Sequence, residues 1–323
     1  KYKMWTFLPI LKSTIWGGDS IAPFKGIKTD KTAIGESWEI SGVEGDESVV
    51  AAGPDKDMTL TALIDKYGEK LLGKKNFQRF GNRFPLLVKI IDAAQDLSVQ
   101  VHPDDYMARR LGQANGKTEM WYVLKAKKDA RLALGFTRAI GREEFRPLVE
   151  SGEIENVLRF VPVRKGEAYF IPGRTVHAIG KGMMVAEIQQ TSDVTYRLYD
   201  YRRKGPDGKE RQLHIDLAEE ASDLGFTDGR AQEYRPVADI PVCLASSPYF
   251  TTNVMHLDME VMRDYREYDT FVILIATEGK AVVECGEEKV ELSAGHSILI
   301  PASAMGVTIS PDKRFSCLET YIK

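Results

Sequence analysis

Short runs of β-branched and aromatic residues recur along the chain, most of them bounded by Gly, Pro, Asp or Asn, and this pattern predicts β-strands. The clearest runs are residues 84–91, 120–124, 168–171, 185–189, 271–276 and 297–300. Helical patterns are fewer: an apolar face predicts a helix over 59–72, weakened by Gly68, and shorter helices over 104–111, 142–151 and 213–223. Strands interrupted by a few helices indicate a mainly β fold with a small helical insertion.

A weak internal repeat indicates that the β fold is built twice. Residues 165–180 read KGEAYFIPGRTVHAIG and residues 294–309 read AGHSILIPASAMGVTI, each with a glycine, an apolar strand, Ile-Pro, a turn and a second strand. Two tandem modules follow, unless such short strands recur by chance. Prolines and polar residues cluster at 235–241. We therefore expect one domain over 1–235, with helical insertions near 56–75 and 103–115, and a second domain over 236–323.

Composition narrows the class of protein. The chain has 323 residues, a formal net charge of −3 and 43% hydrophobic residues, enough for one large or two ordinary domains. The balanced charge offers no broad basic surface to nucleic acid. Three cysteines without a CxxC spacing argue against a disulfide framework and a thiolate zinc site. Residues 1–10 lack the apolar stretch of a secretory signal, and the uncharged segment 292–310 contains a histidine and a proline, unlike a membrane span. We expect a cytoplasmic protein without a nucleic-acid or membrane partner.

Four polar residues have the chemistry of a metal site. Gln100 and His102 stand two positions apart in a predicted strand, so both side chains point to one face. Glu119 begins the next strand, and His177 ends the motif PGRTVHAIG. Two imidazoles, a carboxylate and an amide oxygen suit zinc or another borderline divalent ion. Each residue taken alone is more often an ordinary hydrogen-bonded or surface residue, so the interpretation depends on the whole set.

The motifs resemble those of a known family. Gly166, Pro172 and His177 match the GxxxxxPxxxxH motif of the cupin superfamily, and His102 with Glu119 resembles its first motif. Within that superfamily the chain is similar to the short bacterial form of the type I phosphomannose isomerases. The matching stretches are IWGGDSIAPF at 15–24, GESWEIS at 35–41, PLLVKIIDAAQDLSVQVHPDD at 85–105, GKTEMWYV at 116–123, IPGRTVHAIGKG at 171–182 and EIQQTSDVTYRLYDY at 187–201.

The resemblance implies a fold and a metal. It implies two tandem cupin (jelly-roll) β-barrel modules, with one Zn²⁺ per chain held by Gln100, His102, Glu119 and His177. The second module is expected to be a degenerate, structural cupin, because Gly306 stands where the first repeat has its last histidine ligand. We expect a monomer or a homodimer.

The resemblance also implies a reaction, the interconversion of mannose 6-phosphate and fructose 6-phosphate through a cis-enediol. The candidate proton-transfer groups are Lys89, Lys117, Glu187 and Arg197, of which Glu187 and Lys117 are favoured as the base that takes the C–H proton. Lys89 and Glu187 could instead form a structural ion pair. Substrate contacts are expected from Ser98, Trp16 and Arg202, the last as part of a basic cluster with Arg197, Arg203 and Lys204.

Two other functions remain open from the sequence. A sugar-binding or regulatory cupin without turnover would have the same fold, because fold alone does not fix activity. The presence of Lys117, Glu187 and Arg197 favours the enzyme, since metal binding alone would not need them. An iron oxygenase cupin would use two or three histidines with open positions, and a ligand set rich in Gln and Glu fits it poorly.

Overall fold

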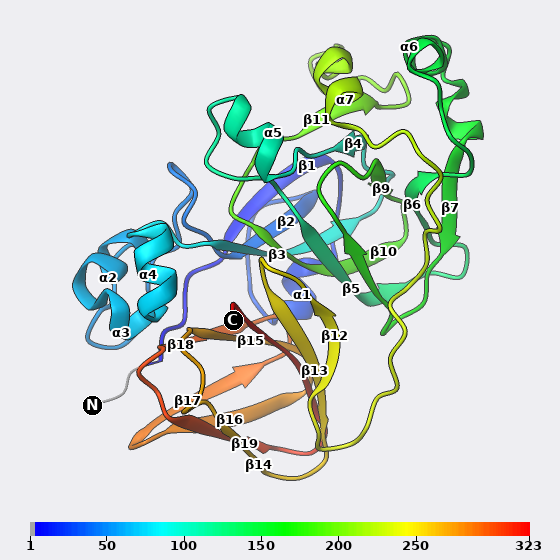
Figure 1. The fold of residues 1–323 in the computed structure, drawn as a ribbon. Coiled ribbons are helices and arrows are strands. Elements are labelled where there is room, and N and C mark those ends of the chain that lie inside the picture. Colours follow the sequence, from blue (N-terminus) through cyan, green and yellow to red (C-terminus); the bar gives the residue numbers. More distant parts are fainter. Residues whose placement is uncertain (1–3) are drawn as a thin grey trace.

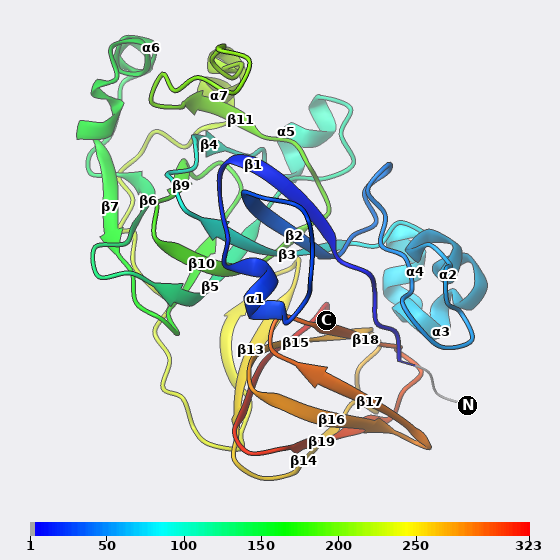
Figure 2. The same cartoon turned by 180° about the vertical axis from the view of Figure 1, so that it is seen from behind.

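The computed structural model describes residues 4–323, so part of the N-terminal segment considered for a secretory signal lies outside the described residues. Two β modules lie one above the other, with a cluster of helices beside them (Figure 1). The same arrangement is seen from behind in Figure 2, where the C-terminus lies between the modules. The predicted mainly β fold is confirmed, and each module consists of two sheets in a jelly-roll arrangement.

The first module contains two antiparallel sheets. The six-stranded sheet has the order β1 (Ile10–Gly18), β2 (Ile34–Ile40), β3 (Leu86–Ala93), β10 (Met183–Gln190), β5 (Glu119–Ala126), β8 (Ala168–Ile171). The five-stranded sheet has the order β11 (Tyr196–Tyr199), β4 (Val99–Val101), β9 (His177–Ile179), β6 (Arg131–Phe136), β7 (Leu158–Pro162). Apolar residues from both sheets pack between them, among them Trp121, Leu132 and Val185.

The second module repeats this plan in nine strands. One sheet has the order β12 (Val242–Ser246), β13 (Thr251–Leu257), β20 (Phe315–Tyr321), β15 (Val272–Glu278), β18 (Ser297–Ile300). The other has the order β14 (Val261–Asp264), β19 (Gly306–Pro311), β16 (Lys280–Cys285), β17 (Glu288–Ser293). Its interior holds Glu319, which is completely buried and accepts hydrogen bonds from Arg263, Tyr265 and Asn253.

The central strands of the six-stranded sheet are buried on both faces. In β3 and β10 every residue is buried, which explains why their sequences are continuous apolar runs rather than alternating ones. Val88 and Ile188 point into a core that is shared with Ile273 and Leu318 of the second module. The other face of the same strands carries Lys89 and Glu187 into the first module.

Helices cover the edges of the first module: α1 (Ile21–Lys25), α2 (Leu60–Tyr67), α3 (Glu69–Leu72), α4 (Lys74–Phe80), α5 (Asp105–Arg110), α6 (Arg142–Ser151), η1 (Glu153–Asn156) and α7 (Ile215–Ala221). The helix expected over 59–72 is divided at Gly68, which has a φ of 49° and ends α2 while it begins α3. The sequence did not predict α1 or α4. No helix of the described residues has both the length and the apolar character needed to span a membrane.

Candidate metal centre and catalytic cavity

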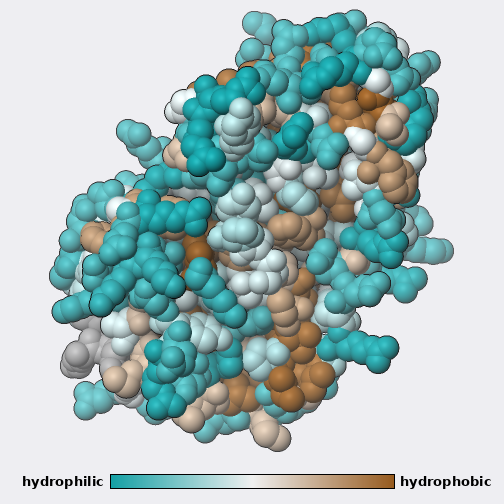
Figure 3. Space-filling model, in the orientation of Figure 1, coloured by the Kyte–Doolittle hydropathy of each residue, from teal (hydrophilic) through white to brown (hydrophobic). Residues whose placement is uncertain are grey.

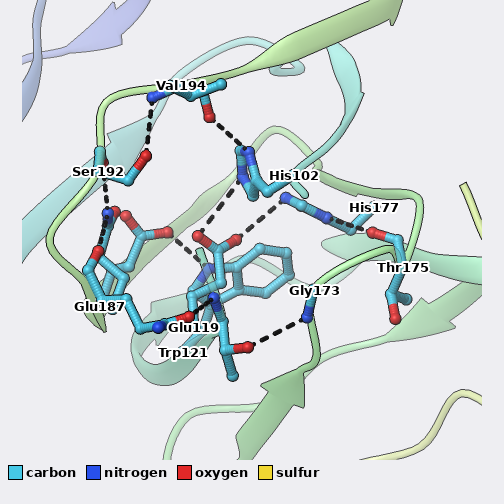
Figure 4. A network of polar contacts seen from close by, with 12 residues as sticks. His102, Glu119, Trp121, Gly173, Thr175, His177, Glu187, Ser192 and Val194 are labelled. Atoms are coloured by element: carbon cyan, nitrogen blue, oxygen red, sulfur yellow. Dashed lines mark hydrogen bonds and ion pairs between the residues drawn. The ribbon is translucent and has the colours of Figure 1, made fainter. Parts of the chain in front are cut away.

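Three strands of the first module bring His102, Glu119 and His177 together. Glu119 is the first residue of β5, His177 is the first residue of β9, and His102 directly follows β4. One ligand atom from each residue lies within 4.8 Å of the others, and all three side chains are buried. Figure 4 shows both imidazoles directed at the Glu119 carboxylate. The sequence prediction that these residues converge is confirmed.

The hydrogen bonds of the two histidines fix which nitrogen faces the carboxylate. Nδ1 of His102 lies 2.9 Å from the Val194 carbonyl oxygen, and Nδ1 of His177 lies 2.8 Å from the Thr175 carbonyl oxygen. A carbonyl oxygen can only accept, so each Nδ1 carries the proton. In the neutral imidazoles Nε2 is then left with a lone pair, 3.6 Å from one Glu119 oxygen in His102 and 3.0 Å from the other in His177.

This arrangement fits a divalent cation. Neither Nε2 atom nor either Glu119 oxygen has a hydrogen-bond partner among residues 4–323, although all four atoms are buried. Buried polar groups without partners are costly, and two nitrogen lone pairs facing a carboxylate repel one another. Burial, assisted by the nearby Lys117, holds the pKa of His102 well below its usual range, so this imidazole is neutral. A cation between the three side chains would satisfy all four atoms, and N/O ligands suit zinc.

Gln100 lies in β4 of the five-stranded sheet, next to the strand that carries His177. It pairs with His177 across β4 and β9, and it lines a cavity together with Glu119. Its side chain is only partly buried, unlike the other three.

The cavity beside the triad has a volume of about 210 Å³. Eight residues predicted for the site line it: Trp16, Lys89, Ser98, Gln100, Lys117, Glu119, Glu187 and Arg197. Trp38 also lines it, and the centre of its ring lies 3.8 Å from Lys12 Nζ and 4.7 Å from Lys89 Nζ. Residues that sequence reasoning did not select are Thr14, Glu36, Asp193, Thr195 and Arg211.

Lys89 lies between two carboxylates on the cavity wall. Its Nζ is 3.2 Å from Glu36 Oε1 and 3.7 Å from Glu187 Oε1. Burial disfavours the ammonium form, but the charges of Glu36 and Glu187 outweigh burial and raise the pKa of Lys89. The ion pair considered from the sequence is therefore present, with Glu36 as the nearer partner.

The pKa values of Glu187 and Lys117 are displaced in opposite directions. Burial, followed by the charge of Glu119, raises the pKa of Glu187 to about 7, although Trp121 Nε1 donates a hydrogen bond to its Oε2 at 2.8 Å. Burial and the charge of Lys89 lower the pKa of Lys117. Perturbed groups that converge on a cavity are typical of a catalytic site.

Arginines lie at one side of the cavity. Nη1 of Arg197 donates to the Gln212 carbonyl oxygen at 2.9 Å, whereas its buried Nε finds no partner among residues 4–323. Burial and the neighbouring Arg211 lower the pKa of the Arg197 guanidinium. Arg211 itself lines the cavity and pairs with Asp200.

The rest of the predicted basic cluster points elsewhere. Arg202 lies outside the cavity lined by Glu119: it donates to the Glu150 carbonyl oxygen and lines a separate pocket between α6 and the segment after β11. Arg203 forms an ion pair with Asp200. The backbone of Lys204 pairs with that of Glu210 in an isolated antiparallel β-bridge. Backbone pairing over residues 204–210 therefore directs this basic run away from the triad.

Fold and site together define a cupin with a candidate metal site. Two family models match the chain: the catalytic domain of type I phosphomannose isomerase over residues 5–148, and the cupin domain of mannose-6-phosphate isomerase over residues 243–315. The chain is 36% identical over 298 residues to mannose-6-phosphate isomerase ManA of Bacillus subtilis, covering 91% of this chain and 92% of that protein. The protein belongs to the type I phosphomannose isomerase family.

Other relatives agree with this family. The mannose-6-phosphate isomerase of Streptococcus mutans is 34% identical over 288 residues, covering 89% of each chain. The crystal structure of mannose 6-phosphate isomerase from Bacillus subtilis superposes with a TM-score of 0.88 at 31% identity, covering 99% of both chains. The apo form from Salmonella typhimurium has a TM-score of 0.78 at 18% identity, with 99% of both chains covered, and supports the fold alone.

Proposed function

We propose that this protein is a zinc-dependent isomerase that interconverts mannose 6-phosphate and fructose 6-phosphate through a cis-enediol intermediate. One observation carries the proposal: the buried His102–Glu119–His177 triad opens on a cavity that also holds Glu187, Lys117 and Arg197. A protein that only binds sugar would not need groups with displaced pKa values next to a cation site. The relatives named for this activity are similar along nearly the whole chain.

The triad is suited to hold the zinc ion, with Gln100 as a fourth ligand. A zinc ion held there would supply a Lewis acid, and its charge would favour a developing oxyanion. Of the four ligands only the Glu119 carboxylate carries a charge. The occupied site would therefore keep a net charge of about +1.

Aldose–ketose exchange requires two proton movements, one between C2 and C1 and one between the oxygens on those carbons. We assign the first to Glu187, because burial raises the pKa of its carboxylate and so makes it a stronger base than an exposed one. We assign the proton transfer between the two oxygens to Lys117, because its lowered pKa makes loss of a proton easier. Lys89, held by Glu36 and Glu187, keeps the Glu187 carboxylate in place.

The phosphate group needs a cation that keeps its charge and has free donors. Arg197 meets this need at the cavity, since a guanidinium forms paired hydrogen bonds with phosphate oxygens and its Nε is without a partner among the described residues. Arg211 is a second candidate on the same wall. A sugar phosphate is ionic and does not cross membranes readily, which supports a cytoplasmic enzyme.

A coupled assay tests the proposal. Purified protein is analysed for bound metal, and mannose 6-phosphate turnover is coupled to a fructose 6-phosphate reporter before and after chelation. We expect turnover with zinc present, loss on chelation and recovery when zinc is restored. Metal-replete protein without turnover would support the sugar-binding alternative, and full activity in metal-free protein would contradict the role of zinc.

A further inference from the structure

Three arginines line a second pocket that is separate from the catalytic cavity. This pocket has a volume of about 350 Å³ and lies where the helical insertion meets the turn before β5 and the C-terminal strand. Arg79 belongs to α4, Arg83 follows that helix, and Arg109 belongs to α5. The surface over α2 to α4 is mostly hydrophilic (Figure 3).

The charges of these three arginines are not neutralised within the chain. None of them forms an ion pair with a carboxylate in the part of the chain that the structure describes. Arg83 is only partly exposed, and its guanidinium donates to two neutral acceptors, Asn115 Oδ1 and the Thr191 carbonyl oxygen. Burial lowers the pKa of Arg83, which shows that its charge lies in a poorly solvated position. Such a position favours an anionic ligand.

A carboxylate lies on the same wall as the arginines. Among residues 4–323 Asp105 is the acidic residue that lines the pocket, and its Oδ1 already accepts from the Gly116 backbone N–H at 2.8 Å and from Gln190 Nε2 at 3.0 Å. The lining therefore carries three positive charges and one negative charge, although the whole chain has more acidic than basic residues.

Tyr249 lies on the pocket wall within the electrostatic influence of charges of both signs. Burial, then the charges of Asp105 and Asp104, raise the pKa of its hydroxyl, and the charges of Arg79 and Arg109 act in the opposite direction. The two guanidinium groups come from different helices, yet both line the pocket that contains Tyr249.

We propose that this pocket binds the phosphate group of a small phosphorylated metabolite, at a site distinct from the catalytic cavity. Guanidinium groups match phosphate oxygens in both charge and geometry, and three arginines line this pocket against the one lining carboxylate of Asp105. A volume of about 350 Å³ accommodates a phosphate group with a small organic part. Neither the triad nor the cavity it faces shares a lining residue with this pocket.

The test uses zinc-loaded full-length protein and inorganic phosphate as the probe. The variant Arg79→Ala/Arg109→Ala removes the two exposed guanidinium groups and leaves Asp105 and Gln190, which support the turn before β5, unchanged. The matched control is Arg110→Ala: this exposed neighbour on α5 pairs with Glu220 and does not line the pocket. Phosphate is titrated by calorimetry at constant ionic strength. The catalytic cavity is unaltered in every protein, so any phosphate that binds there contributes equally to each titration.

We expect wild type and Arg110→Ala to bind phosphate alike, and the double variant to lose one equivalent or to bind it at least tenfold more weakly. Charge-assisted hydrogen bonds of this kind each contribute about one tenfold step or more in affinity. Isomerase kcat/KM within about twofold of wild type would show that the double variant is folded. Equal phosphate binding by all three proteins, including no binding by any of them, would overturn the proposal.

Discussion

Trp121→Phe tests whether ionisation of Glu187 controls turnover. The indole Nε1 donates to Glu187 Oε2 at 2.8 Å between the buried strands β5 and β10. A hydrogen bond to the ionised carboxylate stabilises that form, so its loss raises the pKa of Glu187. Hydrogen bonds to charged groups contribute about 1.5–3 kcal/mol, and about 1.4 kcal/mol corresponds to one pKa unit. We therefore expect the pKa of Glu187 to rise by roughly one to two units.

The sign of the effect on turnover follows from the role of Glu187 as a base. Below its pKa the carboxylate is protonated, so kcat/KM of the wild type falls as the pH decreases through that value. Burial and the charge of Glu119 raise the pKa to about 7. A zinc ion held by Glu119 would offset that charge equally in wild type and variant, so the difference between their acid limbs would remain. The acid limb of Trp121→Phe should therefore lie roughly one to two pH units above that of the wild type.

The measurement is the pH profile of kcat/KM for the zinc-loaded enzymes between pH 5 and 9. Trp5→Phe is the matched control, because Trp5 Nε1 donates to a carboxylate oxygen of Asp55 at 3.0 Å, outside the catalytic cavity. This control should keep the wild-type acid limb. If Trp121→Phe lowered kcat but left the acid limb in place, the limb would not report Glu187, and the assignment of this residue as the base would be refuted.

Three further outcomes follow from the contacts of other residues. His177→Ala should lose both bound zinc and turnover, which metal analysis and the coupled assay check together; retained stoichiometric zinc would contradict the ligand assignment. Arg197→Ala should keep zinc and raise KM for mannose 6-phosphate by at least tenfold, and zinc loss there would refute its role in phosphate binding. Lys25→Met leaves the buried Glu39, 2.7 Å from Lys25 Nζ, without its counter-charge, so unfolding in denaturant should show a loss of about 3–5 kcal/mol. Adding Glu39→Gln should restore part of that loss, and no recovery would argue against a charge effect.

Much of the metal centre was predictable because local motifs carry it. His102, Glu119 and His177 each stand at the start or end of a short strand with a recognisable flanking sequence, and the fold needs only to bring three strand ends together. The loops next to these strands also fix the tautomers of the two histidines, because their carbonyl oxygens accept hydrogen bonds from each Nδ1. This last feature depends on backbone geometry and has no signal in the sequence.

Other parts of the site depend on pairings distant in sequence. Glu36 lies within GESWEIS, a stretch that matches the family, but its contact with Lys89 arises only when β2 pairs with β3. Arg211 directly follows the backbone pairing of Lys204 with Glu210 and lines the cavity, whereas Arg202 and Lys204 do not, so the approach of Arg211 depends on the turn between these residues. The helix expected over 59–72 was wrong in its length because Gly68 adopts a positive φ, where the chain turns between α2 and α3.

The second module has a physical role in catalysis even though it holds no part of the triad. In β3, β5 and β10 the odd-numbered residues Lys89, Glu119 and Glu187 face the cavity, and the even-numbered residues face the core shared with the second module. Without that cover, the apolar face of the sheet would be exposed to water, and the strands could not keep charged groups in dry positions. Burial is the largest influence on the pKa of both Glu187 and Lys117. The second module thus covers the back of this sheet and keeps Glu187 and Lys117 buried, which raises the pKa of Glu187 and lowers the pKa of Lys117.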